Sequence, residues 1–213
     1  MPLILRLKPL LFAVCLLPAA HILCSVYQIF TGTAGLTHLG GKPITEIEIQ
    51  TGLWTMRFLA ITLAVTPLRQ ISGVGVLAKY RRMLGLFTFF YAVLHVSTWV
   101  GADWFFDWSA MAREVVKRKF IFVGMATFLL LIPLALTSRK GWIPRLGGRR
   151  WNRLHRLVYV AAITATIHYL WAVKKDTFFP LVYFAIFAGL LGYRAIPAIQ
   201  ARLARRRQAS TNI

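Results

Sequence analysis

The chain has 213 residues, of which 58% are hydrophobic and only 15% are charged. This composition excludes an ordinary soluble domain, whose surface needs many more polar residues. The formal net charge of +20 would by itself suggest a nucleic-acid partner, but the basic residues gather at the ends of apolar segments, as they do beside a bilayer. We therefore expect a lipid bilayer as the surroundings and no nucleic acid.

Six apolar segments follow one another along the chain, and each approaches the roughly 20 residues that a spanning helix needs. The predicted helices cover about 9–30, 52–71, 80–100, 120–137, 151–171 and 178–197. The alternating polarity of a membrane barrel is absent. The sequence thus predicts an all-α, polytopic membrane protein, a bundle of six transmembrane helices that forms one domain over residues 1–213.

The distribution of basic residues predicts the orientation of this bundle. Six segments put both termini on one side, and 18 of the 26 Lys and Arg residues fall on that side. Seven others fall on the opposite side, together with all six acidic residues. Because Lys and Arg in short loops mark the cytoplasmic face, we expect both termini in the cytoplasm.

Two histidines of the predicted bundle reach matching depths. His95 lies 13 residues after Arg82, about 20 Å along a helix, and His168 lies 12 residues after Arg156, about 18 Å. Both helices start at the basic side, so both imidazoles approach one level in the outer half of the membrane. Two neutral imidazoles from neighbouring helices are the arrangement that holds a haem iron from both faces. The alternative is two unrelated histidines that hydrogen-bond across helices.

A third histidine, His155, lies beside Arg156 at the basic side. A step of 13 residues turns a helix by about 220°, so His155 and His168 leave a straight helix on different faces. We therefore expect His155 to lie outside the site of His95 and His168. Three roles remain open for it: ligand of a second haem, contact to a flavin, or interfacial residue.

Four arginines are candidate contacts for the anionic groups of a cofactor. Arg57 lies inside the second predicted helix, where it either snorkels to the interface or steadies a haem propionate. Arg81, Arg82 and Arg153 crowd the basic side near His155, where they could hold propionates or a flavin phosphate. The alternative for these three is ordinary positive-inside charge.

The loop between the third and fourth predicted helices carries aromatic residues from Trp104 to Trp108. Aromatic side chains at this level normally anchor a protein at the membrane interface. The same loop is the largest apolar feature that follows the third helix on the outer side. It is therefore also a candidate docking surface for a partner protein.

Several stretches together resemble a known family: TGLWTMRFLAITLAVTPLR at 51–69, RRMLGLFTFFYAVLH at 81–95, LALTS at 134–138, WNRLHRLVYV at 151–160 and IHYLWAVK at 167–174. They resemble the haem-binding membrane subunits of bacterial periplasmic methionine sulfoxide reductase systems, in the ferric-reductase-like transmembrane superfamily. The resemblance covers almost the whole chain. It implies haem b, an associated FMN, and His95, His155 and His168 as haem-iron ligands. That superfamily often has two histidines on each of helices three and five. This chain has one on helix three, so the expected number of haems is one or two.

The resemblance also implies a function in the bacterial inner membrane. Electrons from a cytoplasmic flavin reductase or a quinol would pass through flavin and haem to a periplasmic molybdopterin-dependent methionine sulfoxide reductase, the partner in a heterodimer that repairs oxidised proteins. The chain would then be an electron-transfer subunit rather than the catalytic one.

Two other classes compete with this function. A self-contained transmembrane ferric or ascorbate-type haem reductase is disfavoured because no nicotinamide-binding or FAD-binding domain is visible in the sequence. A non-redox transporter or assembly factor is disfavoured because no acidic residue lies inside an apolar segment.

Overall fold

The computed structural model describes residues 7–32, 42–139 and 141–211, with side chains described as far as Ile196 apart from Phe30. The six longer helices are Lys8–Phe30 (α2), Pro43–Ser72 (α3), Arg81–Thr98 (α4), Lys119–Leu136 (α6), Leu157–Ala172 (α9) and Phe178–Thr211 (α10). The shorter ones are Gly75–Lys79 (η2), Trp99–Asp103 (η3), Trp108–Lys117 (α5), Trp142–Leu146 (α7) and Gly148–His155 (α8). The described residues contain no strand, so the all-helical class is confirmed.

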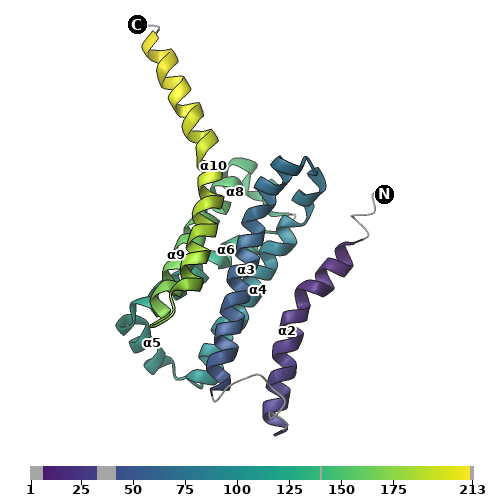
Figure 1. Ribbon diagram of the computed structural model, residues 1–213, viewed down its shortest axis with the longest axis vertical. Helices are drawn as coiled ribbons and strands as arrows, with labels where there is room; N and C mark the ends of the chain where they lie inside the picture. Colours follow the sequence, from purple (N-terminus) through teal and green to yellow (C-terminus); the bar gives the residue numbers. More distant parts are fainter. Residues whose placement is uncertain (1–6, 33–41, 140, 212–213) are drawn as a thin grey trace.

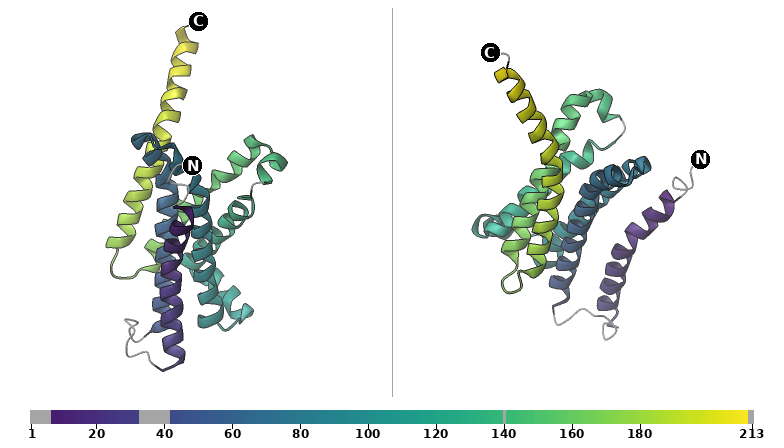
Figure 2. Two further views of the ribbon diagram at one scale, coloured as in Figure 1. Left: turned by 90° about the vertical axis from the view of Figure 1, so that its right-hand side faces the viewer. Right: turned by 45° about the horizontal axis from the view of Figure 1, so that its top comes forward.

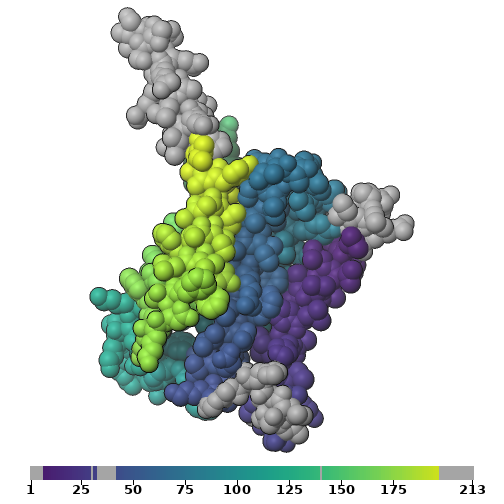
Figure 3. Space-filling model, in the orientation of Figure 1, coloured from purple at the N-terminus to yellow at the C-terminus, as the bar shows by residue number. Residues whose placement is uncertain are grey.

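The long helices run side by side and alternate in direction (Figures 1 and 2). One end of the bundle, here called the acidic end, holds the start of α3, the end of α4, helix α5 and all six acidic residues: Glu46, Glu48, Asp103, Asp107, Glu114 and Asp176. The opposite end, here called the basic end, holds η2, the start of α4 and helices α7 and α8. In the face shown by Figure 3, α3 lies between α2 and α10.

Within the described residues, five helices are long and apolar enough to cross a membrane: α2, α3, α4 together with η3, α6, and α10 as far as Ile196. Helix α9 has 16 residues, fewer than the roughly 20 that cross a bilayer alone. Nevertheless α6 ends at the basic end and α10 begins at the acidic end, so α9 runs between the two ends (Figure 1). Length and composition therefore establish five candidate spans, and the sixth stays a prediction.

Three helix boundaries differ from those expected from apolar runs. Helix α3 begins at Pro43 rather than near Gly52, because Pro in the first turn and Glu46 near the positive end of the helix dipole both favour a helix start there. The predicted helix 151–171 is divided at Arg156 into the basic α8 and the apolar α9. Helix α10 continues through the basic tail to Thr211, since Ala, Arg and Gln are good helix formers in water.

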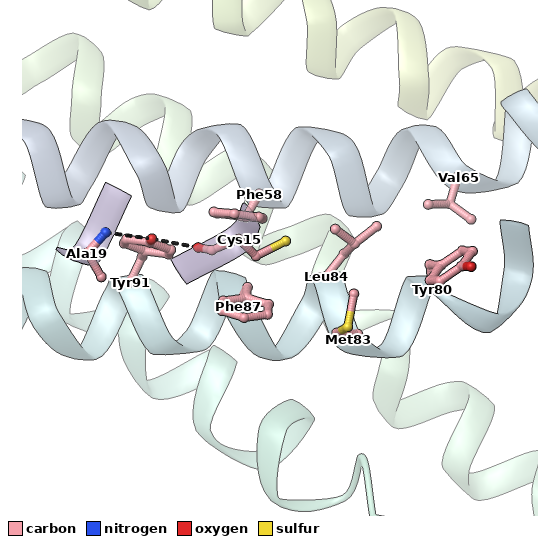
Figure 4. Packing of buried hydrophobic residues seen from close by; sticks show 9 residues of the cluster. All are labelled: Cys15, Ala19, Phe58, Val65, Tyr80, Met83, Leu84, Phe87 and Tyr91. Carbon is pink, nitrogen blue, oxygen red and sulfur yellow. Dashed lines mark hydrogen bonds between the residues drawn. The ribbon is translucent and has the colours of Figure 1, made fainter. Parts of the chain in front are cut away.

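A tyrosine hydroxyl joins α2 to the rest of the bundle (Figure 4). In a regular helix the amide of Ala19 would donate to the carbonyl of Cys15. Here the Tyr91 hydroxyl lies between them: it accepts from Ala19 N at 3.1 Å and donates to Cys15 O at 2.8 Å. The ring stacks on Phe58 at 5.1 Å between centroids and is fully buried. Because a side chain inserted into the helix ladder bends a helix, this contact and Pro18 together account for the curve of α2.

An arginine fills a similar gap in α3. The carbonyl of Leu63 has no helical donor, because residue 67 is proline and lacks an amide hydrogen. The guanidinium of Arg194, from α10, donates to that carbonyl and to the Tyr159 hydroxyl of α9. A polar group inside a bilayer is costly unless it is paired. Arg194 therefore connects α10 to α9 and α3, and it satisfies the α3 carbonyl that lacks a backbone donor.

Candidate functional site

The structure brings His95 and His168 together near the acidic end of the bundle. His95 lies in the last turn of α4, and His168 lies in the last turns of α9. Their ring centroids are 6.1 Å apart, and the ring planes are inclined by 75°. The two helices carry these rings to one level, as the distances from Arg82 and Arg156 along the sequence predict.

Each imidazole is oriented by a backbone carbonyl of a neighbouring helix. His95 Nδ1 lies 2.9 Å from the carbonyl oxygen of Glu48 in α3, and His168 Nδ1 lies 2.7 Å from that of Phe120 in α6. A carbonyl oxygen only accepts, so each Nδ1 carries its hydrogen and each Nε2 keeps a free lone pair. This is the usual state of a metal-binding histidine, whose second nitrogen donates to a carbonyl or carboxylate.

Two glycines make room for these rings. Gly52 follows Glu48 by one helical turn, and a Cβ atom there would lie 3.2 Å from His95 Cε1. Gly124 follows Phe120 by one turn, and a Cβ atom there would lie 2.6 Å from His168 Nδ1. The same arrangement thus occurs twice, with the ring packed over a glycine and bonded to the carbonyl four residues earlier. Sequence reasoning missed both glycines, although an isolated glycine inside an apolar helix is a signal of close approach.

The pair fits a metal ion held from two sides. An imidazole nitrogen binds a metal at about 2 Å, which places the centres of two opposed rings about 6 Å apart. The observed separation of 6.1 Å agrees with this value. Within the described residues, no group of three or more His, Cys, Asp or Glu side chains gathers to hold a metal. The donor set therefore suits a cofactor that brings its own equatorial ligands, as haem does.

His155 lies apart from this pair, in α8 at the basic end. Its ring stacks on Trp151 with centroids 3.7 Å apart, and its Nδ1 lies 3.1 Å from the Trp151 carbonyl oxygen. The Trp151 indole in turn donates to the carbonyl of Thr137 at the end of α6. The structure therefore does not bring His155 to the site of His95 and His168.

The four candidate arginines separate into two groups. Arg57 is half-buried in α3, with its guanidinium carbon 4.4 Å from the centre of the Trp54 ring. Because α3 begins at Pro43, Arg57 lies well inside the helix rather than one turn from its start. Arg81, Arg82 and Arg153 are exposed at the basic end. None of the last three lies at the end that holds His95 and His168.

A hollow of about 430 Å³ lies at the acidic end, on the outside of the bundle, between α5, α6 and α9. It is lined by Val116 at the end of α5, by Lys119, Phe122 and Val123 in the first turns of α6, and by Trp171 in α9. Val123 precedes Gly124, the residue on which the His168 ring packs. The hollow therefore lies beside the segment of α6 that contacts His168 through Phe120 and Gly124.

Comparison with known proteins places the chain in a family. Residues 50–166 match the family described as "Ferric reductase like transmembrane component". The chain is 44% identical over 203 residues to the "Protein-methionine-sulfoxide reductase heme-binding subunit MsrQ" of Xanthomonas oryzae pv. oryzae (strain MAFF 311018), covering 95% of this chain and 92% of that protein. It is 47% identical over 203 residues to the protein of the same name from Herminiimonas arsenicoxydans, covering 94% and 89%. The chain belongs to the MsrQ family.

A further MsrQ protein, from Xanthomonas campestris pv. campestris (strain B100), is 48% identical over 168 residues, which cover 79% of this chain and 77% of that protein. No solved structure matches the chain. The matched segment 50–166 includes His95, His155 and both glycines of the site, and it ends just before His168. The resemblance predicted from sequence is therefore confirmed at the level of the MsrQ family and of the ferric-reductase-like transmembrane proteins.

Proposed function

We propose that this chain is the haem-binding, electron-transfer subunit of a bacterial methionine sulfoxide reductase system. The observation that carries the proposal is the pair of imidazoles, His95 and His168, each with Nδ1 bonded to a carbonyl and Nε2 free. The names of the MsrQ relatives support it independently. When bound between such imidazoles, haem b supplies one-electron transfer with no open position for substrate.

Different residues of this chain would orient the histidine rings and bind the anionic groups of the cofactors. The carbonyls of Glu48 and Phe120 fix the tautomer and direction of the two rings, and Gly52 and Gly124 let the rings approach α3 and α6. Arg57 is the proposed partner on α3 for a haem propionate. In this structure its guanidinium packs on the Trp54 ring. Arg81 and Arg153 are proposed partners for the phosphate of FMN at the basic end.

The proposed direction of electron flow follows from the charges of the two ends. The basic end faces the cytoplasm under the positive-inside rule, in the inner membrane, with all six long helices crossing it. A cytoplasmic flavin reductase or a quinol would supply the electrons, and FMN and haem, if bound to this chain, would carry them toward the acidic end. There the proposed partner, a periplasmic molybdopterin-dependent methionine sulfoxide reductase, receives them near His168.

The test is the visible spectrum and the haem content of three single variants of the full-length protein, before and after dithionite. Because each imidazole would supply one of the two nitrogen ligands to the haem iron, His95→Ala and His168→Ala should lose the same haem signal to a similar degree. His155→Ala should retain it and impair either a second haem or electron uptake from the cytoplasmic side.

His21→Ala is the matched control, because His21 is exposed on α2. If His155→Ala abolished the same low-spin species as His95→Ala while His168→Ala retained it, the proposed pairing of histidines would be incorrect.

A further inference from the structure

A second hollow lies toward the basic end of the bundle, between α4 and α6, and its lining does not include either histidine of the pair. It has a volume of about 240 Å³. Arg82, Leu86 and Phe89 line it from one face of α4, where residues four and three apart lie above one another. Leu136, the last residue of α6, and Arg139, three residues after the helix ends, line it from the other side. Two arginines and a set of apolar side chains therefore share one small site.

The two arginines of this hollow have no acidic partner. Both are exposed. Within the described part of the chain, the one ion pair joins Arg118 to Glu114 at the other end of the bundle. All six acidic residues also lie at that end. The guanidinium groups of Arg82 and Arg139 are therefore available to an anion that does not come from this part of the protein.

The rest of the hollow suits a hydrocarbon chain. Leu86 and Leu136 are 39% and 60% exposed, and so face the bilayer. Phe89 stacks on Phe128 with centroids 5.9 Å apart, which closes the hollow toward the bundle. The volume lies below the roughly 300–1,000 Å³ of pockets that enclose a whole small molecule. It therefore suits one part of a larger ligand whose remainder stays in the membrane.

We propose that this hollow binds an anionic phospholipid, with the phosphate between Arg82 and Arg139 and an acyl chain along Leu86 and Phe89. Basic pockets between helices on the cytoplasmic side are known to bind such headgroups. The charge complementarity, the membrane-interface position and the apolar wall all select this ligand. The inference needs the membrane orientation proposed above, and it is independent of the histidine pair.

The experiment is native mass spectrometry of the full-length protein in detergent, titrated with phosphatidylglycerol or with zwitterionic phosphatidylcholine of the same acyl chains. Each arginine near an anionic headgroup contributes about a fivefold factor in affinity, so Arg82→Gln with Arg139→Gln should weaken phosphatidylglycerol binding about 25-fold. Arg145→Gln with Arg149→Gln removes the same charge from exposed positions at the same end and should change it less than twofold. Leu86→Trp, which fills the hollow but keeps both arginines, should also weaken it.

Two competitors separate a lipid from other sources of phosphate. Inorganic phosphate and FMN should not displace bound phosphatidylglycerol if the acyl chain contributes to binding. The proposal is overturned if either displaces the lipid, if the two double variants weaken binding equally, or if wild type prefers neither lipid. Should the Arg82 and Arg139 double variant fail to fold by circular dichroism, Leu86→Trp decides, and unchanged binding in that variant rejects the site.

Discussion

At the scale of single residues, the candidate site depends on the fit between an imidazole and a glycine. The two positions differ in how much space a methyl group would find. A Cβ at Gly52 would meet His95 at 3.2 Å, whereas one at Gly124 would meet His168 Nδ1 at 2.6 Å. The first contact is tight, and the second requires the ring to move. The glycines therefore offer a graded test of the site that leaves both histidines in place.

We expect Gly124→Ala to displace the His168 ring and to lower haem occupancy, since overpacking costs about 1–3 kcal/mol. Gly52→Ala should have the smaller effect, because its Cβ would be only slightly too close to His95. Haem content per protein and the low-spin spectrum measure both. Gly189→Ala in α10 is the control, because a Cβ there meets nothing within 4 Å. Equal haem content in Gly124→Ala and Gly189→Ala would show that the close approach of His168 to α6 is not needed.

At the scale of elements, α2 depends on few contacts with the other helices, and the Tyr91 hydroxyl is one of them. Tyr91→Phe should let the amide of Ala19 bond directly to Cys15 O and should release α2 from α4. Hydrogen bonds between membrane helices contribute about 0.6 kcal/mol on average, which corresponds to a roughly threefold change in an equilibrium.

Cysteine alkylation can measure this release, because Cys15 is buried against the bundle and Cys24 is exposed. In a Cys24→Ser background, maleimide should label Cys15 about three times faster when Tyr91→Phe is present. Tyr27→Phe, at an exposed position on the same helix, should leave the rate unchanged. An unaltered rate in Tyr91→Phe would mean that apolar packing alone holds α2.

The aromatic loop after α4 divides into an inner and an outer part. Trp104 packs against Trp99 with centroids 6.4 Å apart. Phe105 and Trp108 are 78% and 65% exposed. Phe105 also has a φ of 46°, a left-handed conformation that is costly for a bulky residue. A strained turn that directs aromatic rings outward suits an interface better than a core.

If this loop docks the proposed partner, Trp108→Ala should slow electron delivery to it by about fivefold or more, the effect of losing roughly 1 kcal/mol at an interface. Haem content should not change. The measurement is the reoxidation rate of the reduced protein mixed with the partner reductase. Trp104→Ala is the comparison. Because the Trp104 ring packs on Trp99, its removal should mainly lower the thermal stability of the protein. Equal loss of haem and of rate in Trp108→Ala would indicate a folding role instead.

At the scale of the whole molecule, charge is distributed unequally between the two ends of the bundle. The acids lie at one end, and most basic residues of the described chain lie at the other. This separation predicts the orientation in the membrane without reference to any cofactor. It also depends on α9, because a chain in which α9 did not cross would place α10 in the reverse direction.

A reporter that is active only in the periplasm tests both points. Fused after Asn212, it should be inactive, and inserted after Lys175, in the turn between α9 and α10, it should be active. Activity at both sites, or at the first alone, would contradict six crossings with cytoplasmic termini. Comparable expression of the two fusions, measured by immunoblot, is the control.

The amino-acid sequence was enough to predict the six long helices, how the basic residues divide between the ends, and that His95 and His168 reach one level. It did not predict the start of α3 at Pro43 or the short helix α5. The predicted properties depend only on rise per residue and on the polarity of short segments. The partners of these residues became visible in the folded chain: the carbonyls of Glu48 and Phe120, the two glycines, and the pairing of Arg194 with the carbonyl that Pro67 leaves free. Lipid and protein interior are equally apolar, so the sequence of a membrane helix carries little information on which face meets which neighbour. That choice is made by close packing between helices distant in sequence, and only the assembled bundle displays it.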